Sequence, residues 1–426
     1  MSDLLSLLNE DNPLQPTLAK SKQGWLWVAS VLIGCTICVP VFFMGAQMGA
    51  QQAFWPFVAA CFLGGILATA IAIATGIIGQ RTGLPTAMLA KIAFGHRGYI
   101  LANAAMVLGA IGWFGIQTAI FSGAFLKLSM QVWGIEFARV PVILVAGLLM
   151  SSTAVIGFRG LGRLSYIATP LLIVLLILPL YVFARDGLLA GVSAHVPAAP
   201  LAFGTMVAMV AGAYSFASTM PDVTRFMRNS KETVKGLIAN FTLAYPVLLI
   251  VTGALAIAGN ESDFMQIMLN LGFGSLAIVV LFLATWTTND TNVYSAAVSG
   301  NVFLPQFQRW QLAVGAGVLG TFAAIFGIFE HFMEWLIFSG NLYAPMAGVY
   351  VADYFLNRQR YEKLGDVPAF HVKQLAAWGI GLAVGLSTTD KSNMGLELFR
   401  LTTVPMLDAL LTAALALFLL TRPSRR

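Results

Sequence analysis

The chain has 426 residues, of which 58% are hydrophobic and 10% are charged, and its formal net charge is +6. Soluble domains carry about 25% charged residues, so this composition excludes a soluble globular protein and predicts an integral membrane protein. The cysteines, Cys35, Cys38 and Cys61, all fall in apolar stretches and do not suggest a disulfide framework.

Apolar stretches long enough to cross a bilayer follow one another along the chain. A transmembrane helix needs roughly 20 apolar residues, and residues 23–80, which contain no charged side chain, are long enough for two helices with a polar break at Gly45–Gln52. The other spans are predicted at 98–126, 140–157, 164–184, 202–220, 236–259, 271–298, 310–328, 330–352, 370–388 and 401–421. The sequence therefore predicts an all-α protein with twelve transmembrane helices, grouped as ten plus two.

The distribution of basic residues predicts the orientation of these helices. With a cytoplasmic N-terminus, 19 of the 24 lysines and arginines fall in segments on the inner side, as the positive-inside rule requires. We therefore expect a multi-pass protein of the cell (inner) membrane with both termini in the cytoplasm. Contact with the inner leaflet accounts for the positive charge, so no nucleic-acid partner is inferred, and no obligate protein partner either.

The residue types that enzymes use do not converge in this sequence. The four histidines are scattered without a metal-ligand spacing, and there is no glycine-rich phosphate loop. Cys35 and Cys38 have the CxxC spacing, but they lie inside an apolar helix, where packing explains them better. These observations predict a gradient-driven transporter or channel and argue against an enzyme or an ATP-driven pump.

Four clusters of polar or Gly/Pro residues interrupt the apolar spans and are candidate sites, because polar groups are costly at membrane depth. They lie at 34–40 in span one, 112–117 in span three, 212–222 in span six and 284–290 in span eight. Because they gather at one depth, they favour a transporter over a channel.

Spans one and six each begin a block of five helices, and both are interrupted by Gly and Pro. Paired interruptions of this kind are typical of inverted-repeat transporters. We therefore expect a cytoplasmic tail at 1–23, a transport core at 24–352 made of halves 24–185 and 202–352, and two additional helices with a cytoplasmic C-terminus at 353–426.

Several motifs resemble those of nucleobase:cation symporter family 1, which includes the bacterial cytosine (purine-cytosine) permeases. They are IGQRTGL at 78–84 followed by Phe94-Gly95, GWFG at 112–115, PDVTRF at 221–226, WTTND at 286–290, VADY at 351–354 and NRQRY at 357–361. The resemblance implies a leucine-transporter-like fold of two inverted five-helix repeats plus two helices. It also implies sodium-coupled import of a nucleobase by alternating access.

The resemblance further implies the residues of the substrate site. Trp113 would stack on the flat heterocycle, and Asn289 would bond its polar edge. The predicted site is completed by the following residues from spans one, three and six: Cys38, Gln117, Gly212, Ala213, Tyr214 and Ser215.

For the coupling Na⁺, the resemblance implies three carbonyls and two hydroxyls. These are the carbonyls of Gly34, Ile37 and Ala284 and the hydroxyls of Thr287 and Thr288. Ala284, Thr287 and Thr288 share one helix face by their spacing, and neutral oxygens beside a half-helix end suit a monovalent hard cation.

Two positions depart from the cytosine permease pattern. Ala110 replaces a Gln one turn before Trp113, whereas Gln117 lies one turn after it, as in the related hydantoin transporter. Ala213 replaces a second stacking aromatic, for which Tyr214 or Phe216 would compensate. We expect cytosine or a related pyrimidine, and a purine, a hydantoin or a thiamine-precursor pyrimidine remains an alternative.

Acidic residues near the predicted core leave proton coupling as the alternative to sodium. Asp290 lies beside Asn289, and Glu330, His331 and Glu334 lie close together at the start of span ten. We favour a structural role for Asp290, because every implied cation ligand is a neutral oxygen.

Overall fold

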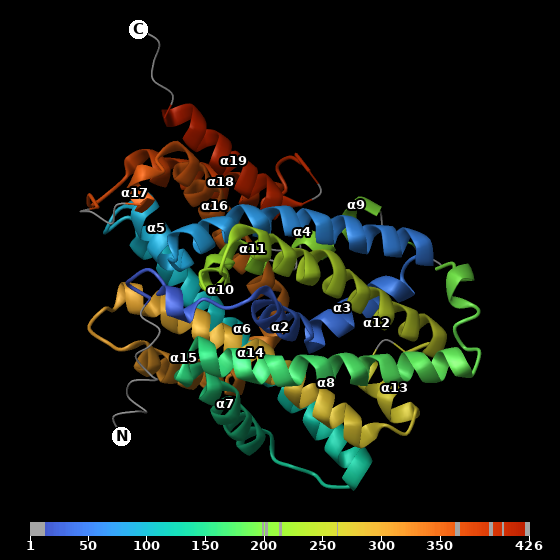
Figure 1. Ribbon diagram of the computed structural model, residues 1–426. Helices are drawn as coiled ribbons and strands as arrows, with labels where there is room; N and C mark the ends of the chain where they lie inside the picture. Colours follow the sequence, from blue (N-terminus) through green and yellow to red (C-terminus); the bar gives the residue numbers. More distant parts are fainter. Residues whose placement is uncertain are drawn as a thin grey trace.

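The computed structural model describes residues 13–197, 200, 203–212, 215–261, 263–362, 367–391, 395–402 and 404–421, and these residues form a helical bundle (Figure 1). The side chains of residues 212, 215, 303, 332–334, 336–339 and 342 are outside this description. One end of the bundle carries α5 (Thr86–Phe94) and α17 (Gln359–Glu362), and the opposite end carries α13 (Phe264–Asn270). We call these the α5 end and the α13 end.

Each predicted span coincides with a helix or with a broken pair of helices. The helices of the first half are α2 (Trp25–Thr36), α3 (Val39–Ala50), α4 (Phe54–Thr82), α6 (Tyr99–Trp133), α7 (Arg139–Ile156) and α8 (Phe158–Arg185). Those of the second half are α9 (Phe203–Gly212), α10 (Pro221–Thr224), α11 (Ser230–Leu237), α12 (Tyr245–Gly259), α14 (Gly274–Phe303), α15 (Arg309–Ile325) and α16 (Phe332–Leu356). The last two are α18 (Val372–Thr388) and α19 (Pro405–Thr421), which pack together and against α16.

The predicted interruption of span one is present as a sharp bend. Helices α2 and α3 meet at an angle of 64°, and Cys38, between them, has an extended backbone with φ −140° and ψ 157°. Pro40 lies in the first turn of α3, where its missing N–H costs little, whereas it would break a continuous helix. The bend leaves carbonyls at the end of α2 available to groups on α14.

The second predicted interruption, in span six, is also a break in the helix. Helix α9 ends at Gly212, a short 3₁₀ turn, η3, covers Ser215–Thr219, and α10 begins at Pro221. Residues 213 and 214 lie between these elements, outside the described residues.

Other elements differ from the sequence prediction. Short helices α5 and α13 lie between the predicted spans, and at 9 and 7 residues they are too short to be found by a search for stretches of roughly 20 apolar residues. A π-helical segment, η4 (Ile238–Ala244), joins α11 to α12. Helix α14 runs unbroken through Asp290, because one acid in mid-helix disturbs hydropathy but not backbone hydrogen bonding.

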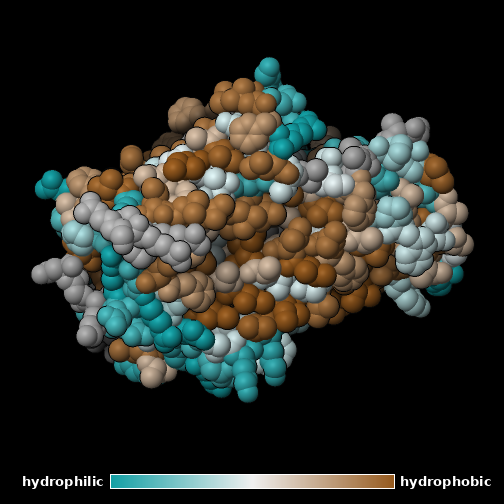
Figure 2. Space-filling view, turned by 90° about the horizontal axis from the view of Figure 1, so that it is seen from above, coloured by the Kyte–Doolittle hydropathy of each residue, from teal (hydrophilic) through white to brown (hydrophobic). Residues whose placement is uncertain are grey.

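The surface is consistent with a membrane protein of several spans. Five of the described helices are long and apolar enough to cross a bilayer by length and composition, or six if α2 and α3 count as one broken span. Figure 2 shows hydrophobic surface dominating the middle of one face, with hydrophilic side chains gathered toward its margins. The count of twelve spans and the inverted repeat stay predictions.

The α5 end is closed by packed side chains and by an N-terminal strap, residues 13–24. Phe158 and Phe226 stack with ring centroids 3.8 Å apart. The buried Arg225 donates to the Tyr294 hydroxyl at 2.8 Å. The backbone N–H of Gln23, in the strap, donates to the Phe226 carbonyl at 2.6 Å, so the strap lies directly across this closure.

Candidate functional site

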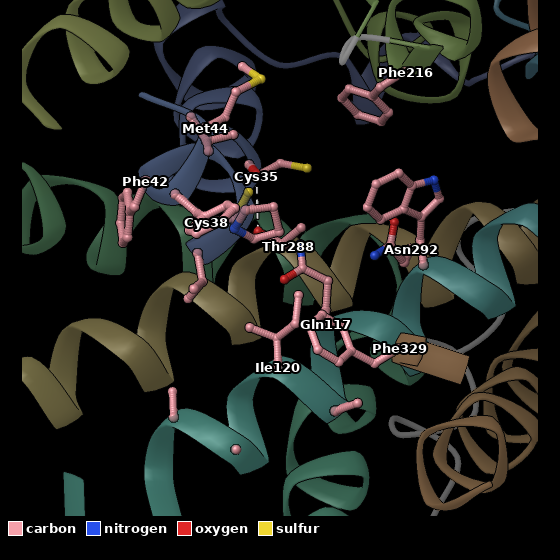
Figure 3. Close-up of a pocket in the computed structure, with 18 of the residues that line it drawn as sticks. Cys35, Cys38, Phe42, Met44, Gln117, Ile120, Phe216, Thr288, Asn292 and Phe329 are labelled. Atoms are coloured by element: carbon pink, nitrogen blue, oxygen red, sulfur yellow. Dashed lines mark hydrogen bonds between the residues drawn. The ribbon is translucent and has the colours of Figure 1, made fainter. Parts of the chain in front are cut away.

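A cavity of about 750 Å³ lies at the bend between α2 and α3, among α3, α6, α14, α16 and the η3 turn. Figure 3 shows side chains from the bent helix, from α6 and from α14 converging on it, with Phe216 on the opposite side. Its lining reaches the charged side chains Lys127, Arg139 and Asp263 near the α13 end. Lys127 and Asp263 form an exposed salt bridge of 3.1 Å there, so the cavity extends toward that end.

Hydroxyls of α14 meet the broken end of α2 beside this cavity. The Thr287 hydroxyl donates to the Gly34 carbonyl at 2.7 Å and lies 3.2 Å from the Ala284 carbonyl. The Thr288 hydroxyl lies 2.9 Å from the same Ala284 carbonyl. The structure therefore brings together four of the five oxygens that the sequence predicted as cation ligands.

The fifth predicted ligand, Ile37, lies in the bend itself, as the residue that follows α2, and its N–H donates to the Ile33 carbonyl. The Thr288 hydroxyl instead contacts the Cys35 carbonyl at 3.0 Å (Figure 3). Sequence reasoning missed this carbonyl. Which carbonyls a bent helix end offers depends on the angle of the bend, and the sequence does not specify that angle.

This set of oxygens suits Na⁺ chemically. All are neutral carbonyl or hydroxyl oxygens, and hard cations of this size prefer such ligands. The Thr287 hydroxyl also has an acceptor on its own helix, the Leu283 carbonyl at 3.0 Å. Its proton can therefore be donated along α14 while its oxygen lone pairs face a cation.

Two predicted substrate residues of α6 face the cavity. Trp113 is half-buried, Gln117 is 2% exposed, and both line the cavity one helical turn apart. The Oε1 atom of Gln117 is buried and has no hydrogen-bond partner among the described residues. A buried acceptor without a partner is costly, so this atom is suited to accept a hydrogen bond from a ligand.

The predicted residues of spans one and six are placed only in part. Cys38 lines the cavity at the start of α3. Gly212 ends α9 and Ser215 begins η3, with their side chains undescribed, and Ala213 and Tyr214 lie outside the described residues. Phe216 lines the cavity across from α6 (Figure 3), and its compensating role as an aromatic of span six stays a prediction.

Asn289 does not point into the cavity in this structure. It is fully buried, and its amide nitrogen donates to the Thr118 hydroxyl at 2.9 Å and the Phe114 carbonyl at 3.3 Å. Its amide oxygen accepts from Asn292 at 3.3 Å. The side chain therefore joins α14 to α6, and its contact with substrate stays a prediction.

The α14 side chain that does line the cavity at this level is Asn292 (Figure 3), and the sequence analysis did not select it. Thr288, Asn292, Ser295 and Ser299 all line the cavity, and their spacing places them on one helix face. This spacing is the signal that would have identified them, once Thr288 is assigned to the cavity.

The acidic residues considered for proton coupling are separate from the cavity lining. Asp290 is fully buried, and neither carboxylate oxygen has a hydrogen-bond partner among the described residues. Glu330 and His331 are exposed, and the side chain of Glu334 is undescribed.

Comparison with known proteins identifies the family. A family model described as permease for cytosine/purines, uracil, thiamine, allantoin matches residues 16–399. The chain belongs to this family. It is 31% identical over 384 residues to the cytosine permease of Escherichia coli K12, covering 89% of this chain and 90% of the relative. It is 23% identical to the hydantoin permease of Microbacterium maritypicum, over 90% of this chain and 85% of that one.

Solved structures support the fold. A nucleobase-cation-symport-1 family transporter, in a closed conformation with bromovinylhydantoin bound, matches with a TM-score of 0.78 and 21% identity over 97% of this chain and 95% of that one. A Na⁺-coupled sialic acid symporter matches with a TM-score of 0.69 and 15% identity, covering 97% of this chain and 94% of that chain. The protein is thus a multi-pass membrane permease of the nucleobase transporter type and not an enzyme.

Proposed function

We propose that the protein is a sodium-coupled symporter that imports cytosine or a related pyrimidine by alternating access. The observation that carries this proposal is the meeting of the Gly34 carbonyl, the Ala284 carbonyl and the Thr287 and Thr288 hydroxyls beside the cavity that Trp113 lines. A cation at these oxygens stabilises the bend of α2 and α3, and the bend forms part of the cavity wall. Cation and base therefore favour the same arrangement of helices, which is the condition for coupling.

In the proposed substrate site, the base stacks on Trp113, and Gln117 accepts from a ring N–H or exocyclic amine. Cys38 and the Gly212–Ser215 segment complete the site, together with Phe216 and Asn292 from the cavity lining. Ile37 and Asn289 keep their predicted roles only if the bend or α14 moves during the transport cycle.

We further propose the membrane arrangement predicted from the sequence. It comprises twelve spans in the inner membrane, with a 24–352 core of two inverted halves, 24–185 and 202–352. The tail 1–23 and the C-terminal part of 353–426 lie in the cytoplasm. This arrangement places the α13 end outside, where the cavity receives the base.

The proposed function is tested with purified protein in proteoliposomes. Uptake of labelled cytosine should rise with an inward sodium gradient and fall when choline replaces sodium at fixed pH. Competition by unlabelled uracil, hydantoin, allantoin and adenine ranks the substrates. Uptake that ignores sodium and follows an inward proton gradient would instead support the proton-coupled alternative, for which the buried carboxylate of Asp290 is the candidate.

A further inference from the structure

The cavity continues beyond the level of Trp113 toward the α5 end. Two α14 serines in its lining, Ser295 and Ser299, lie one and two turns past Asn292 in that direction, and Tyr343 of α16 lines the same part. At 1.5 Å per residue, Ser299 lies about 10 Å along α14 from Asn292, which lines the cavity at the level of Trp113. This separation is longer than a one- or two-ring base, so a base stacked on Trp113 cannot contact Ser299.

The polar groups in this inner part lack protein partners. The hydroxyls of Ser295 and Ser299 have no hydrogen bond within the described part of the chain, and Ser299 is 1% exposed. Elsewhere on α14, buried hydroxyls bond to their own helix: Thr285, for example, donates to the Leu281 carbonyl at 2.8 Å. The Ser299 hydroxyl therefore lacks a hydrogen bond among the described residues, although a carbonyl of the preceding turn of its own helix is the usual acceptor for such a hydroxyl.

Asn103 of α6 is a second buried polar side chain without hydrogen-bond partners among the described residues. It is fully buried, and neither its amide oxygen nor its amide nitrogen has a partner among the residues described. A buried amide has several hydrogen bonds to make, and leaving them all unmade is among the costlier arrangements in a protein interior.

The pairing of α6 with α14 puts Asn103 at the level of Ser299. The two helices are antiparallel, since Asn289 bonds to the Phe114 carbonyl and the Tyr99 hydroxyl bonds to the Val302 carbonyl at 2.9 Å. Counting along the helices from these two bonds brings Asn103 opposite residues 300 and 298 of α14, on either side of Ser299. Asn103 is not itself among the residues that line the cavity, but it shares a helix face with Met106, which is.

The inner part is bounded on both sides. Toward Trp113, the Tyr343 hydroxyl donates to the Met106 carbonyl at 3.2 Å. Toward the α5 end, Tyr99, Val302 and Met346 are buried in one apolar cluster. The unsatisfied groups thus lie between the Trp113 level and the apolar closure of the α5 end.

We propose that this inner part is a second position for the transported base, which the base occupies after leaving Trp113 and before release at the α5 end. The proposal rests on the proposed function. The amide of Asn103 and the hydroxyls of Ser295 and Ser299 offer donors and acceptors without charge, which suits a neutral heterocycle. Asn103, Ser295 and Ser299 offer hydrogen bonds without the ring stacking that Trp113 supplies, so the inner position binds the base more weakly.

Equilibrium dialysis of the purified protein against labelled cytosine, in sodium, tests the proposal over a wide concentration range. Wild type should show a tight and a weak binding component. Trp113→Ala should remove the tight component and keep the weak one. Asn103→Leu, which removes both amide groups at similar volume, should remove the weak component and change the tight affinity by less than about twofold. It should slow uptake by about tenfold, the effect of roughly one lost buried hydrogen bond.

Ser299→Ala should give a smaller effect in the same direction, and Ser129→Ala is the matched control. Ser129 is a buried α6 serine whose hydroxyl bonds to the Leu126 carbonyl, so this variant should keep both components. A single component in wild type, or a weak component that survives in Asn103→Leu, overturns the inference and means that the inner part holds water only. Absence of the tight component from wild type overturns the proposed function as well, so the two failures are distinguishable.

Discussion

Trp113 and Gln117 lie one turn apart on α6, and both face the cavity, so the flat face and one edge of a base can be recognised from a single helix. Replacing Trp113 by Ala should weaken binding of cytosine by about fivefold from lost stacking alone, which contributes about 1 kcal/mol, and by more once the lost buried area is added. Binding to purified protein checks this. The control is Trp55→Ala, because Trp55 is 64% exposed on α4. Near-normal binding by Trp113→Ala would make Trp113 a packing residue.

Gln117→Leu tests recognition of the ring edge. Its buried Oε1 has no partner among the described residues, so a ligand N–H that loses this acceptor is left unpaired, at a cost of roughly 1–3 kcal/mol. Affinity should fall by roughly 5-fold to 150-fold for bases that present a donor at that edge, and less for bases that do not. A competition panel of cytosine, uracil and hydantoin measures the difference. An equal loss for all three would show that Gln117 does not read the edge.

At the scale of elements, the contact between α14 and the broken end of α2 should carry the coupling. Thr288→Val keeps the shape of the side chain and removes the hydroxyl that contacts the Cys35 and Ala284 carbonyls. Sodium should then lose most of its ability to tighten base binding. The coupling free energy between two such ligands is typically about 1–3 kcal/mol. Titrating the base with and without sodium measures the coupling. Thr285→Val is the control, because the Thr285 hydroxyl bonds to the Leu281 carbonyl of its own helix. Coupling that persists in Thr288→Val would place the ion elsewhere.

The N-terminal strap should respond to pH through Lys22. This side chain donates to the Arg225 carbonyl at 2.6 Å, and burial, with a smaller contribution from the Arg225 charge, lowers the pKa of Lys22 from 10.5 to about 8. The docked strap therefore binds fewer protons than a released one between those values. Its docking is least stable below pH 8 and becomes more stable as the pH rises toward 10.5.

Hydrogen exchange measures this effect. The Gln23 amide, which bonds to the Phe226 carbonyl, should show greater protection at pH 9.5 than at pH 7.5 after correction for intrinsic exchange. Lys22→Met should remove this pH dependence, and a dependence that survives in the variant would assign it to another group.

At the scale of the whole molecule, the sequence predicted the features that depend on neighbouring residues along the chain, namely apolar stretches, helix breaks and helix faces. The apolar stretches coincide with helices of the bundle among the described residues, and Gly34 with Pro40 predicted the bend because proline cannot continue a helix. The i, i+3, i+4 spacing of Ala284, Thr287 and Thr288 predicted their shared face. The rest depends on packing: the rotation of α14 against α6 decides that Asn292 and not Asn289 faces the cavity, and the angle of the bend decides that Cys35 and not Ile37 meets Thr288.

The direction in which the cavity opens predicts how the native cysteines react in cells. Cys35 is half-buried in the cavity lining, Cys38 lines it as well, and Cys61 is fully buried. If the α13 end faces outward, a membrane-impermeant methanethiosulfonate added to intact cells should label Cys35 first and leave Cys61 unmodified. Saturating cytosine with sodium should slow the labelling in proportion to the occupied fraction. Mass spectrometry of the modified peptides identifies the cysteine, and the Cys35→Ser variant is the control.

The same reagent applied to inside-out vesicles should reach the cysteines slowly, because Phe158, Phe226, Arg225 and the strap close the α5 end. Faster labelling in these vesicles than in intact cells would reverse the proposed orientation, or show that the inward-open state dominates in the membrane. Measuring the labelling rate in intact cells that carry the Thr288→Val variant distinguishes a reversed orientation from a dominant inward-open state. Loss of the cation contact shifts the balance between states, whereas it cannot change the orientation of the chain in the membrane.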